Sequence, residues 1–121
     1  MKSTTNEVKS YVDQNLKDVK TVNSVSRGMH EPYDLLRKKF LKEEGVPLGR
    51  YIMRQKVRAM QEMLTVTDYP CFFVCYEMGY REDTGAKVFK KLTGMTMLEY
   101  KRWSREQQRR TAAQFHTTTI H

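Results

Sequence analysis

Residues 79–103, GYREDTGAKVFKKLTGMTMLEYKRW, contain the pattern that decides the fold. A glycine-aromatic pair opens the stretch and a short lysine-bearing helix follows. A Thr-Gly break then leads to a second short helix that ends in Trp103. A tight turn before a helix with lysines on its exposed side, supported by one more helix, is the outline of a helix-turn-helix unit that reads DNA. The stretch therefore predicts one such unit.

Length and charge narrow the class of protein. The 121 residues suffice for one compact domain or for two very small domains that share a helix. The formal net charge of +8 favours a polyanionic partner, most often nucleic acid and less often an acidic membrane surface. No apolar run approaches the roughly 20 residues of a membrane span, and the N-terminus does not resemble a signal peptide. We therefore expect a cytoplasmic protein with no membrane partner.

The residues that could do chemistry form no catalytic or metal-binding pattern. Cys71 and Cys75 share one face of a predicted helix, and two cysteines with three scattered histidines give no zinc spacing. We interpret both cysteines as small core residues. No Ser/His/Asp set, paired carboxylates or phosphate loop is present. We therefore expect no enzymatic activity, no cofactor and no metal.

The first half of the chain predicts a helix over about 6–17, a short helix over about 21–28 that Gly28 ends, and a helix over 32–44. In the third helix, side chains at i, i+3 and i+7 should be buried, and the opposite side should be solvent-exposed. The predicted buried residues are Tyr33, Leu36 and Phe40, and the opposite face carries Asp34, Arg37, Lys38 and Leu41, flanked by Lys39 and Lys42. Such a face suits a DNA groove, but an ordinary solvated face fits equally well.

Residues 47–64 form the longest run with helical periodicity, which predicts a long amphipathic helix that could join two small units rigidly. Its basic residues occupy the faces not used by the apolar stripe. They are Arg50, Arg54, Lys56 and Arg58.

The second half predicts helices over about 71–78, 83–92 and 96–104, with Asp83 or Thr84 as the N-cap of the middle one. Thr96 and Glu99 have the spacing of a capping box at the start of the last helix. In the middle helix, the inner face is Val88, Phe89 and Leu92, and the outer face carries Asp83, Lys87 and Lys90, flanked by Lys91.

The same unit occurs twice, at 21–45 and at 70–94: a short helix, a turn, a basic helix and a closing glycine. We therefore predict an all-α fold of seven helices in two helix-turn-helix subdomains joined by a long central helix. The predicted parts are a disordered leader (1–5), a first subdomain (6–46), a linker helix (47–66), a second subdomain (67–104) and a flexible basic tail (105–121).

The chain resembles AraC/XylS-type DNA-binding domains, and among them the small stand-alone MarA/SoxS/Rob-like members. The resemblance rests on GVPLGRYIMRQKVRAMQEML at 45–64, PCFFVCYEMGY at 70–80 and FKKLTGMTMLEYKR at 89–102. It implies a bilobed double helix-turn-helix fold that binds promoter DNA, usually as an activator that contacts RNA polymerase. By position, it places Asp34, Arg37, Lys38 and Leu41 of the first unit at or near base-contacting sites, and Asp83, Lys87 and Lys90 of the second unit toward the groove.

Several positions depart from the family pattern. His30 stands where the family usually has its turn glycine, and Pro32 stands at the usual serine N-cap. The second unit is one residue shorter between Gly79 and Phe89, and Gly85 should cost its helix about 1 kcal/mol relative to alanine. These departures make the first unit the better candidate for reading bases.

Our leading hypothesis is a sequence-specific transcription regulator, an activator in a bacterial cytoplasm at the nucleoid, that binds two adjacent major grooves as a monomer. Backbone phosphates would be contacted by Lys42, Arg50, Arg54 and Lys91. The expected partners are double-stranded promoter DNA and RNA polymerase, with no small-molecule ligand in this chain. Two alternatives stay open: a protein-interaction or anti-activator module with a degenerate second reader, and the DNA-binding part of a larger ligand-sensing regulator.

Overall fold

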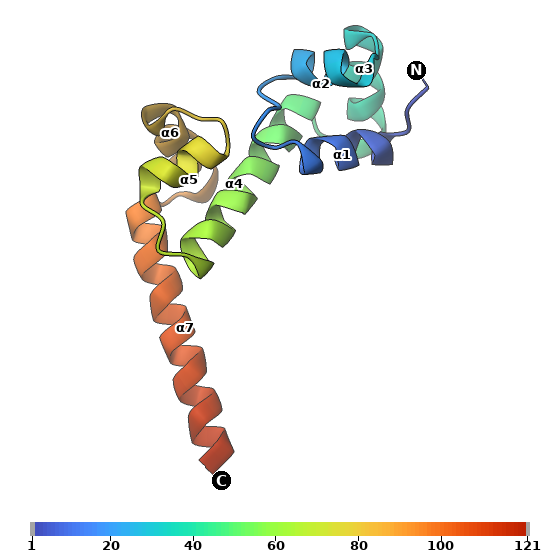
Figure 1. The fold of residues 1–121 in the computed structure, drawn as a ribbon. Helices are drawn as coiled ribbons and strands as arrows, with labels where there is room; N and C mark the ends of the chain where they lie inside the picture. Colours follow the sequence, from blue (N-terminus) through green and yellow to red (C-terminus); the bar gives the residue numbers. More distant parts are fainter. Residues whose placement is uncertain (1, 121) are drawn as a thin grey trace.

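The computed structural model describes residues 2–120, with side chains described through residue 114. Within this part the chain has seven α-helices and no strand, which confirms the predicted all-α fold (Figure 1). The helices are α1 (Thr5–Gln14), α2 (Val22–Met29), α3 (Tyr33–Glu44), α4 (Leu48–Val66), α5 (Cys71–Glu77), α6 (Glu82–Thr93) and α7 (Met97–Ile120).

Two hydrophobic cores divide the helices into two lobes that share α4 (Figure 1). The first lobe is α1, α2, α3 and the start of α4, packed around Phe40 and Leu48. The second lobe is the rest of α4 with α5, α6 and the start of α7, packed around Met60 and Phe89. The apolar stripe of α4 serves both cores, which is why one amphipathic helix can join two units.

The lobes also touch directly at the end of α1. The side chain of Leu16 packs against both cores. Lys17 places its ammonium 4.0 Å from the ring centre of Tyr76 and 3.9 Å from the Glu77 carboxylate. The backbone of Gly79 lies so close to the Lys17 carbonyl that a Cβ there would collide with it. Together with α4, this junction sets the angle between the two lobes.

Lys56 of α4 is buried at the same junction, with 1% of its surface exposed. Its ammonium donates a 2.7 Å hydrogen bond to the Met78 carbonyl and lies 4.8 Å from the ring centre of Tyr80. Burial, with a smaller contribution from the positive charge of Lys20, lowers the pKa of Lys56 to about 8. We expected Lys56 outside the apolar stripe, and this is wrong because it belongs to a buried stripe with i, i+4 spacing, with Ile52 before it and Met60 after it.

The end of α2 also differs from prediction. We expected Gly28 to end this helix in a left-handed turn, but α2 continues to Met29 and His30 adopts the left-handed conformation, with φ of 55°. Gly28 lies inside the helix, where a Cβ would collide with the ring of Tyr11. Gly28 therefore leaves room for the Tyr11 ring against α2, and the turn falls at the position where the resemblance expects a glycine.

The start of α6 lies earlier than predicted. Arg81 is the N-cap and Glu82 is the first helical residue, whereas we expected Asp83 or Thr84 as the cap. The capping box of α7 is confirmed. The Thr96 backbone N–H donates to the Glu99 carboxylate at 2.9 Å, and the Glu99 backbone N–H donates to the Thr96 hydroxyl at 3.1 Å.

The leader has defined contacts from residue 3 onward, in contrast to the disordered leader that we expected. The backbone N–H and hydroxyl of Ser3 donate to the buried Glu31 carboxylate at 2.9 and 2.8 Å, and these bonds lower the pKa of Glu31. Thr4 caps α1 in a capping box with Glu7. Residue 1 lies outside the described residues. The leader therefore supports the turn between α2 and α3.

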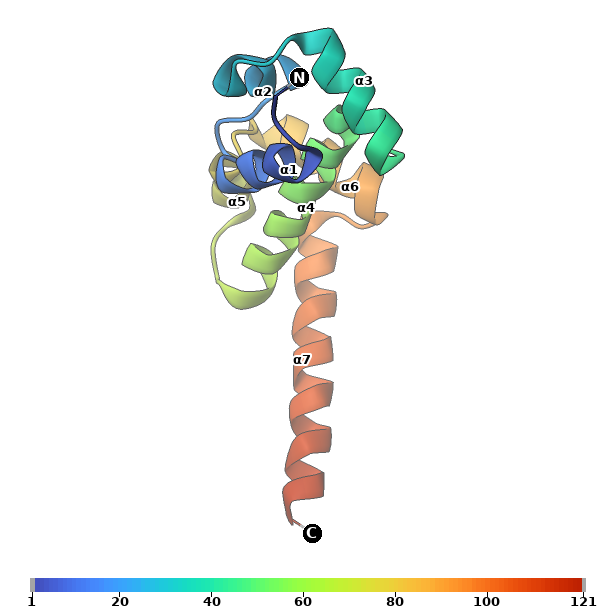
Figure 2. The same ribbon diagram turned by 90° about the vertical axis from the view of Figure 1, so that its right-hand side faces the viewer.

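The last helix is longer than predicted. We expected it to end near residue 104 and to give way to a flexible tail, but α7 continues to Ile120 and projects beyond the second lobe (Figure 2). Its first turns are held on the end of α4 and the connector after it: the Ser104 hydroxyl donates to the Thr65 hydroxyl at 2.9 Å, and Arg105 donates to the Asp68 carboxylate at 2.8 Å. Residues 105–114 have no apolar core stripe, so periodicity could not reveal this extension. No helix among the described residues has the length and hydropathy to cross a membrane.

Candidate nucleic-acid interface

The face of α3 is divided as predicted, with one exception. Leu36 and Phe40 are fully buried, whereas Tyr33, which we expected in the core, is 40% exposed. Tyr33 is the first residue of the helix, where the apolar stripe of α3 begins. All five predicted site residues of α3 are exposed: Asp34, Arg37, Lys38, Leu41 and Lys42.

The face of α6 is arranged in the same way. Phe89 is fully buried, but Leu92, which we expected on the inner face, is 37% exposed and lines a cleft. Asp83 accepts a 2.9 Å hydrogen bond from the Thr84 backbone N–H and lies 3.7 Å from the guanidinium of Arg81. Its charge is therefore partly balanced by Arg81. All four predicted site residues of α6 are exposed: Asp83, Lys87, Lys90 and Lys91.

The predicted cations share one electrostatic property. Within residues 2–114, none of them forms an ion pair, whereas Lys39, a flanking residue of α3, pairs with Glu43 at 3.9 Å. Cations that form no ion pair within the protein are available to neutralise the charge of an external polyanion. They are Arg37, Lys38 and Lys42 of α3, Arg50 and Arg54 of α4, and Lys87, Lys90 and Lys91 of α6, all exposed.

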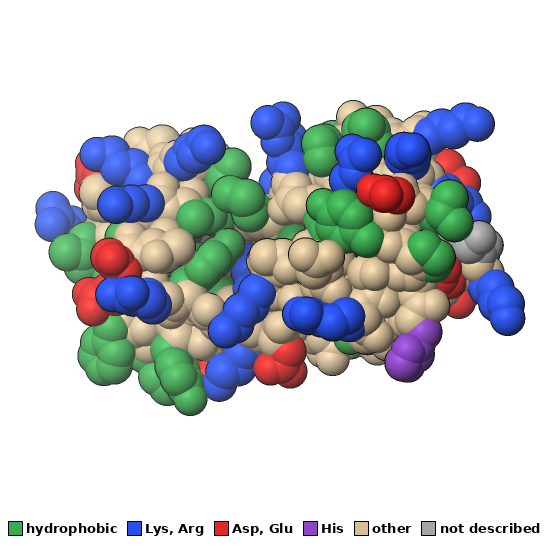
Figure 3. Space-filling view, turned by 90° about the horizontal axis from the view of Figure 1, so that it is seen from above, with side chains coloured by type: hydrophobic (Ala, Val, Ile, Leu, Met, Phe, Trp, Pro, Cys, Tyr) green, Lys and Arg blue, Asp and Glu red, His purple; other side chains and the backbone are tan. Residues whose placement is uncertain are grey.

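The helices α3 and α6 lie on the same side of α4, and α7 projects from the opposite side (Figure 1). The view onto the side with α3 and α6 shows Lys and Arg side chains over both lobes, with fewer acidic ones between them (Figure 3). The structure thus brings the two predicted faces onto one surface of the molecule.

The two units are terminated alike, which supports the internal repeat. Gly45 follows α3 with φ of 75°, and Gly94 follows α6 with φ of 79°. The turns that precede these helices also contain a left-handed residue each, His30 in the first unit and Gly79 in the second. Each unit is therefore a short helix, a left-handed turn and an exposed basic helix.

Gly85 has a packing role in the second unit. A Cβ on Gly85 would lie 2.5 Å from the Cys75 sulfur, 3.0 Å from the Cys75 Cβ and 3.2 Å from the Tyr80 Cβ. Because α6 approaches α5 this closely, any larger residue would force its neighbours to shift. We had interpreted Gly85 as a sign of a weakened unit, but the close packing of Cys75 and Tyr80 against it explains why this position holds a glycine.

The two cysteines are free thiols. Cys75 is buried against Gly85 and Met97, and this burial raises the pKa of its thiol to about 11. Such a thiol stays protonated and unreactive near neutral pH. Within the described part of the chain, no group of three or more His, Cys, Asp or Glu residues is placed to hold a metal ion.

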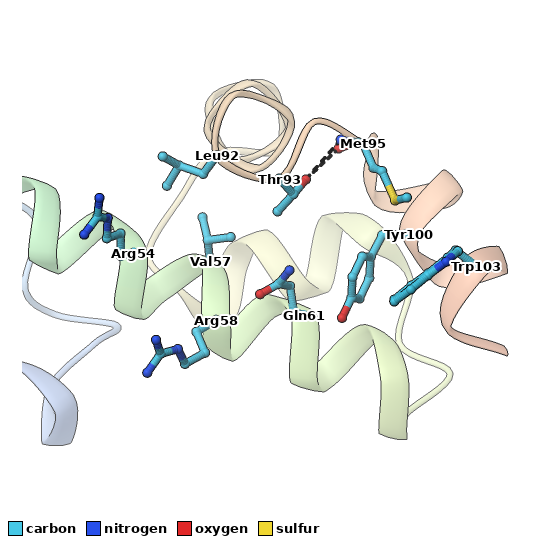
Figure 4. A pocket seen from close by; sticks show the side chains of 9 residues that line it. All are labelled: Arg54, Val57, Arg58, Gln61, Leu92, Thr93, Met95, Tyr100 and Trp103. Carbon is cyan, nitrogen blue, oxygen red and sulfur yellow. Dashed lines mark hydrogen bonds between the residues drawn. The ribbon is translucent and has the colours of Figure 1, made fainter. Parts of the chain in front are cut away.

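A cleft of about 570 Å³ lies next to the basic surface, between α4 and the segment that joins α6 to α7 (Figure 4). Arg54 and Arg58 stand toward one end of the cleft and Trp103 stands at the other, with Val57 and Gln61 of α4 between them (Figure 4). Sequence reasoning missed this cleft because its residues come from separate segments of the chain.

Neither a family model nor a curated protein matches the sequence. Solved structures do resemble the fold. The C-terminal domain of AraT, a response regulator from Geobacillus stearothermophilus, matches with a TM-score of 0.77 at 19% identity, over 81% of this chain and 83% of that one. The DNA-binding domain of AdpA, solved in complex with a target DNA, matches with a TM-score of 0.77 at 17% identity, over 85% and 94%.

A transcriptional regulator from Chromobacterium violaceum, described as containing an AraC-type DNA-binding domain, matches with a TM-score of 0.73 at 12% identity, over 82% of this chain and 89% of that one. These matches span both lobes and agree with the two repeated units. The chain therefore has the AraC/XylS-type helix-turn-helix fold.

Proposed function

We propose that this protein is a sequence-specific regulator of transcription that binds double-stranded DNA with α3 and α6 in two adjacent major grooves. The observation that supports it best is the presence of two exposed basic helix faces on one side of the molecule, whose cations form no ion pair among the described residues. The shared fold with AdpA, whose DNA-binding domain was solved on a target DNA, agrees with it.

The geometry of α4 suits this arrangement. Its 19 residues span about 28 Å at 1.5 Å per residue, and the two lobes extend beyond its ends. Successive major grooves on one face of DNA are about 34–36 Å apart. Because the junction around Lys56 also holds the lobes together, one molecule can present both helices at a set spacing. We infer that the protein binds as a monomer.

The side chains divide into two roles. On α3, Arg37 and Lys38 extend from the middle of the exposed face and are our candidates for base contacts, together with Asp34 and Leu41. On α6, the corresponding candidates are Asp83, Lys87 and Lys90. The phosphate contacts are assigned to Lys42, Arg50, Arg54 and Lys91.

Selection of bound duplexes from a random pool, followed by fluorescence anisotropy with the selected site, tests the proposal. We expect an asymmetric site with two half-sites one helical turn apart. Arg37→Ala should weaken binding by about 10- to 100-fold and relax the sequence preference at one position. Arg50→Ala should weaken binding to all duplexes and reduce the slope of log K against log salt by about 1.

Lys39→Ala is the matched control, since Lys39 lies on the same helix but is paired with Glu43. It removes the same charge and should leave the sequence preference unchanged. Equal affinity for every duplex, with no difference between Arg37→Ala and Lys39→Ala, would contradict the assignment of α3 as a reader of bases.

We further propose that the DNA-bound protein activates transcription by contacting RNA polymerase in a bacterial cytoplasm. In vitro transcription from a template bearing the selected site measures this directly. Transcript yield should rise with protein concentration, and a fall would make the protein a repressor.

A protein-interaction module is the second candidate. One observation favours it: the side chains of Phe72 and Tyr76, one helical turn apart on α5, are 57% and 58% exposed, so two large apolar groups lie on one exposed face. The sequence argument for this candidate was a degenerate second unit with a glycine inside its helix. That argument is weaker now, because close packing against α5 explains Gly85. Absence of duplex binding at low salt would favour this candidate over the DNA reader.

A further inference from the structure

The connector between α1 and α2 contacts the turn of the second helix-turn-helix unit. This connector, residues 15–21, lies on the side of the first lobe that faces the second lobe (Figure 1). Its Lys17 carbonyl lies so close to Gly79 that a Cβ on Gly79 would collide with the oxygen. Gly79, with φ of 74°, is the left-handed residue of the turn between α5 and α6. A part of the first lobe therefore touches the turn that leads into the second basic helix.

The connector is fixed to the first lobe. Val19 is buried in the first core, with 2% of its surface exposed. The backbone N–H groups of Asp18 and Val19 both donate to the Asn15 carbonyl, at 3.0 and 2.9 Å. The Asn15 side-chain amide in turn donates to the Tyr11 carbonyl of α1 at 2.8 Å. Because of these bonds, the connector moves with the first lobe.

Lys56 holds the same turn from the side of α4. Its ammonium donates to the Met78 carbonyl, just before Gly79, and lies under the ring of Tyr80, just after it. Because Lys56 is buried, water does not replace this acceptor when the turn moves away. A hydrogen bond to a charged group changes an equilibrium constant by about 10- to 100-fold. The turn is therefore held on two sides, by α4 and by the connector.

The position of this turn determines where α6 lies. The turn ends at Arg81, the N-cap of α6, so a shift of residues 78–80 carries the start of α6 with it. On the other side, α3 belongs to the lobe that carries the connector. The basic faces of α3 and α6 are thus linked through the connector and the turn, in addition to the link along α4.

We propose that Lys56 is a positioning residue, which together with the connector fixes α6 relative to α3 and restricts the protein to one spacing of DNA half-sites. This inference rests on the proposed function, in which both helices enter major grooves. One extra base pair moves a half-site by about 3.4 Å and rotates it by about 34° around the DNA axis. For α6 to follow, the turn must leave the connector and Lys56 must lose its bond to the Met78 carbonyl. Lys56 acts through the turn, because it is buried and does not face the DNA.

Three duplexes test the spacing by fluorescence anisotropy: the selected site, and the same site with one base pair added or removed between the half-sites. The parent should bind the altered duplexes about 10- to 100-fold more weakly, since the charged hydrogen bond must break. Lys56→Met has no such bond to lose, so its loss should be smaller by about tenfold or more. Lys56→Arg keeps a charged donor and should keep the preference of the parent. A variant that is merely less stable would bind all three duplexes more weakly by the same factor.

The orientation of the helices is measured without DNA, by ¹⁵N residual dipolar couplings. In the parent, the couplings of α3 and α6 should fit one alignment tensor, and in Lys56→Met those of α6 should need a tensor of their own. Lys17→Gln provides a second variant, because it removes the contacts with Tyr76 and Glu77 across the lobes from an exposed position. Lys9→Gln is its matched control, since Lys9 pairs with Glu44 inside the first lobe at 2.6 Å, and it should leave the couplings unchanged.

Two results would overturn the proposal. One is a single alignment tensor for α3 and α6 in both Lys56→Met and Lys17→Gln. The other is an equal loss of affinity for the altered duplexes in the parent and in Lys56→Met. A parent that selects no DNA site contradicts the proposed function instead, and the couplings then decide by themselves whether Lys56 positions α6.

Discussion

Substitution of Gly85 by alanine tests the closest helix contact of the second unit. In an exposed helix interior, Gly→Ala stabilises by about 1 kcal/mol because alanine has the higher helix propensity. At Gly85 the new Cβ would meet the Cβ atoms of Cys75 and Tyr80 at 3.0 and 3.2 Å. Both atoms are attached directly to the backbone, so they can move away only if α5 and the turn after it shift relative to α6.

The magnitude follows from these two opposing effects. Overpacking of a core costs about 1–3 kcal/mol, and the gain in helix propensity offsets about 1 kcal/mol of it. We expect Gly85→Ala to lower the free energy of unfolding by up to about 2 kcal/mol. For a domain of this size, that corresponds to a decrease in Tm of up to roughly 8 °C.

Gly49→Ala is the internal control. Gly49 lies in α4, and a Cβ there would meet only Val22, at an ordinary distance of 3.8 Å. This variant should be more stable than the parent by up to about 1 kcal/mol. Urea denaturation followed by circular dichroism measures both variants on one scale, and Gly49→Ala and Gly85→Ala should move the midpoint in opposite directions.

A double-mutant cycle identifies the atoms responsible. Cys75→Ala removes the sulfur that would lie 2.5 Å from the new Cβ, so the double variant should lose less stability than the sum of the single variants. A rise in stability of Gly85→Ala like that of Gly49→Ala would refute the close approach of α5 and α6. An additive cycle would show that the sulfur is not the obstacle.

Further outcomes follow from the lobe junction and the first turn. The pKa of Lys56, lowered to about 8 from its ordinary 10.5, means that the unfolded chain binds more protons above pH 8, so this group makes the protein more stable as pH rises. From pH 7 to 9 the parent should gain about 1.4 kcal/mol relative to Lys56→Met in urea denaturation, and parallel pH profiles would argue against a buried ammonium. The comparison stops at pH 9 because Cys75, with its pKa raised to about 11, acts in the opposite direction between pH 9 and 11. His30→Gly should raise the free energy of unfolding by about 1 kcal/mol, since His30 is the only non-glycine residue with positive φ among the described residues and its side chain is exposed. Thermal unfolding measures this change, and His30→Ala, which keeps the strain, should show no such gain.

The sequence alone determined the helices and their faces. Helical periodicity placed Leu36 and Phe40 inside and Arg37 and Lys38 outside, because an amphipathic helix must bury one stripe whatever it packs against. The repeat of a short helix, a turn and a basic helix predicted two similar units for the same local reason. Whether these faces bind DNA remains a prediction.

Only the tertiary structure decided how these parts meet. Lys56 looked like one more surface cation, and its burial depends on the Met78 carbonyl, 22 residues away. From the sequence, Gly85 was expected only to weaken its helix, and its close contact with α5 is visible only in the tertiary structure. The start of the α7 extension, where Arg105 pairs with Asp68, and the cleft at Arg54 and Trp103 likewise depend on neighbours that are distant in sequence. Periodicity reports which face of a helix is apolar, but the partner of that face, and the space left between partners, is set by packing in three dimensions.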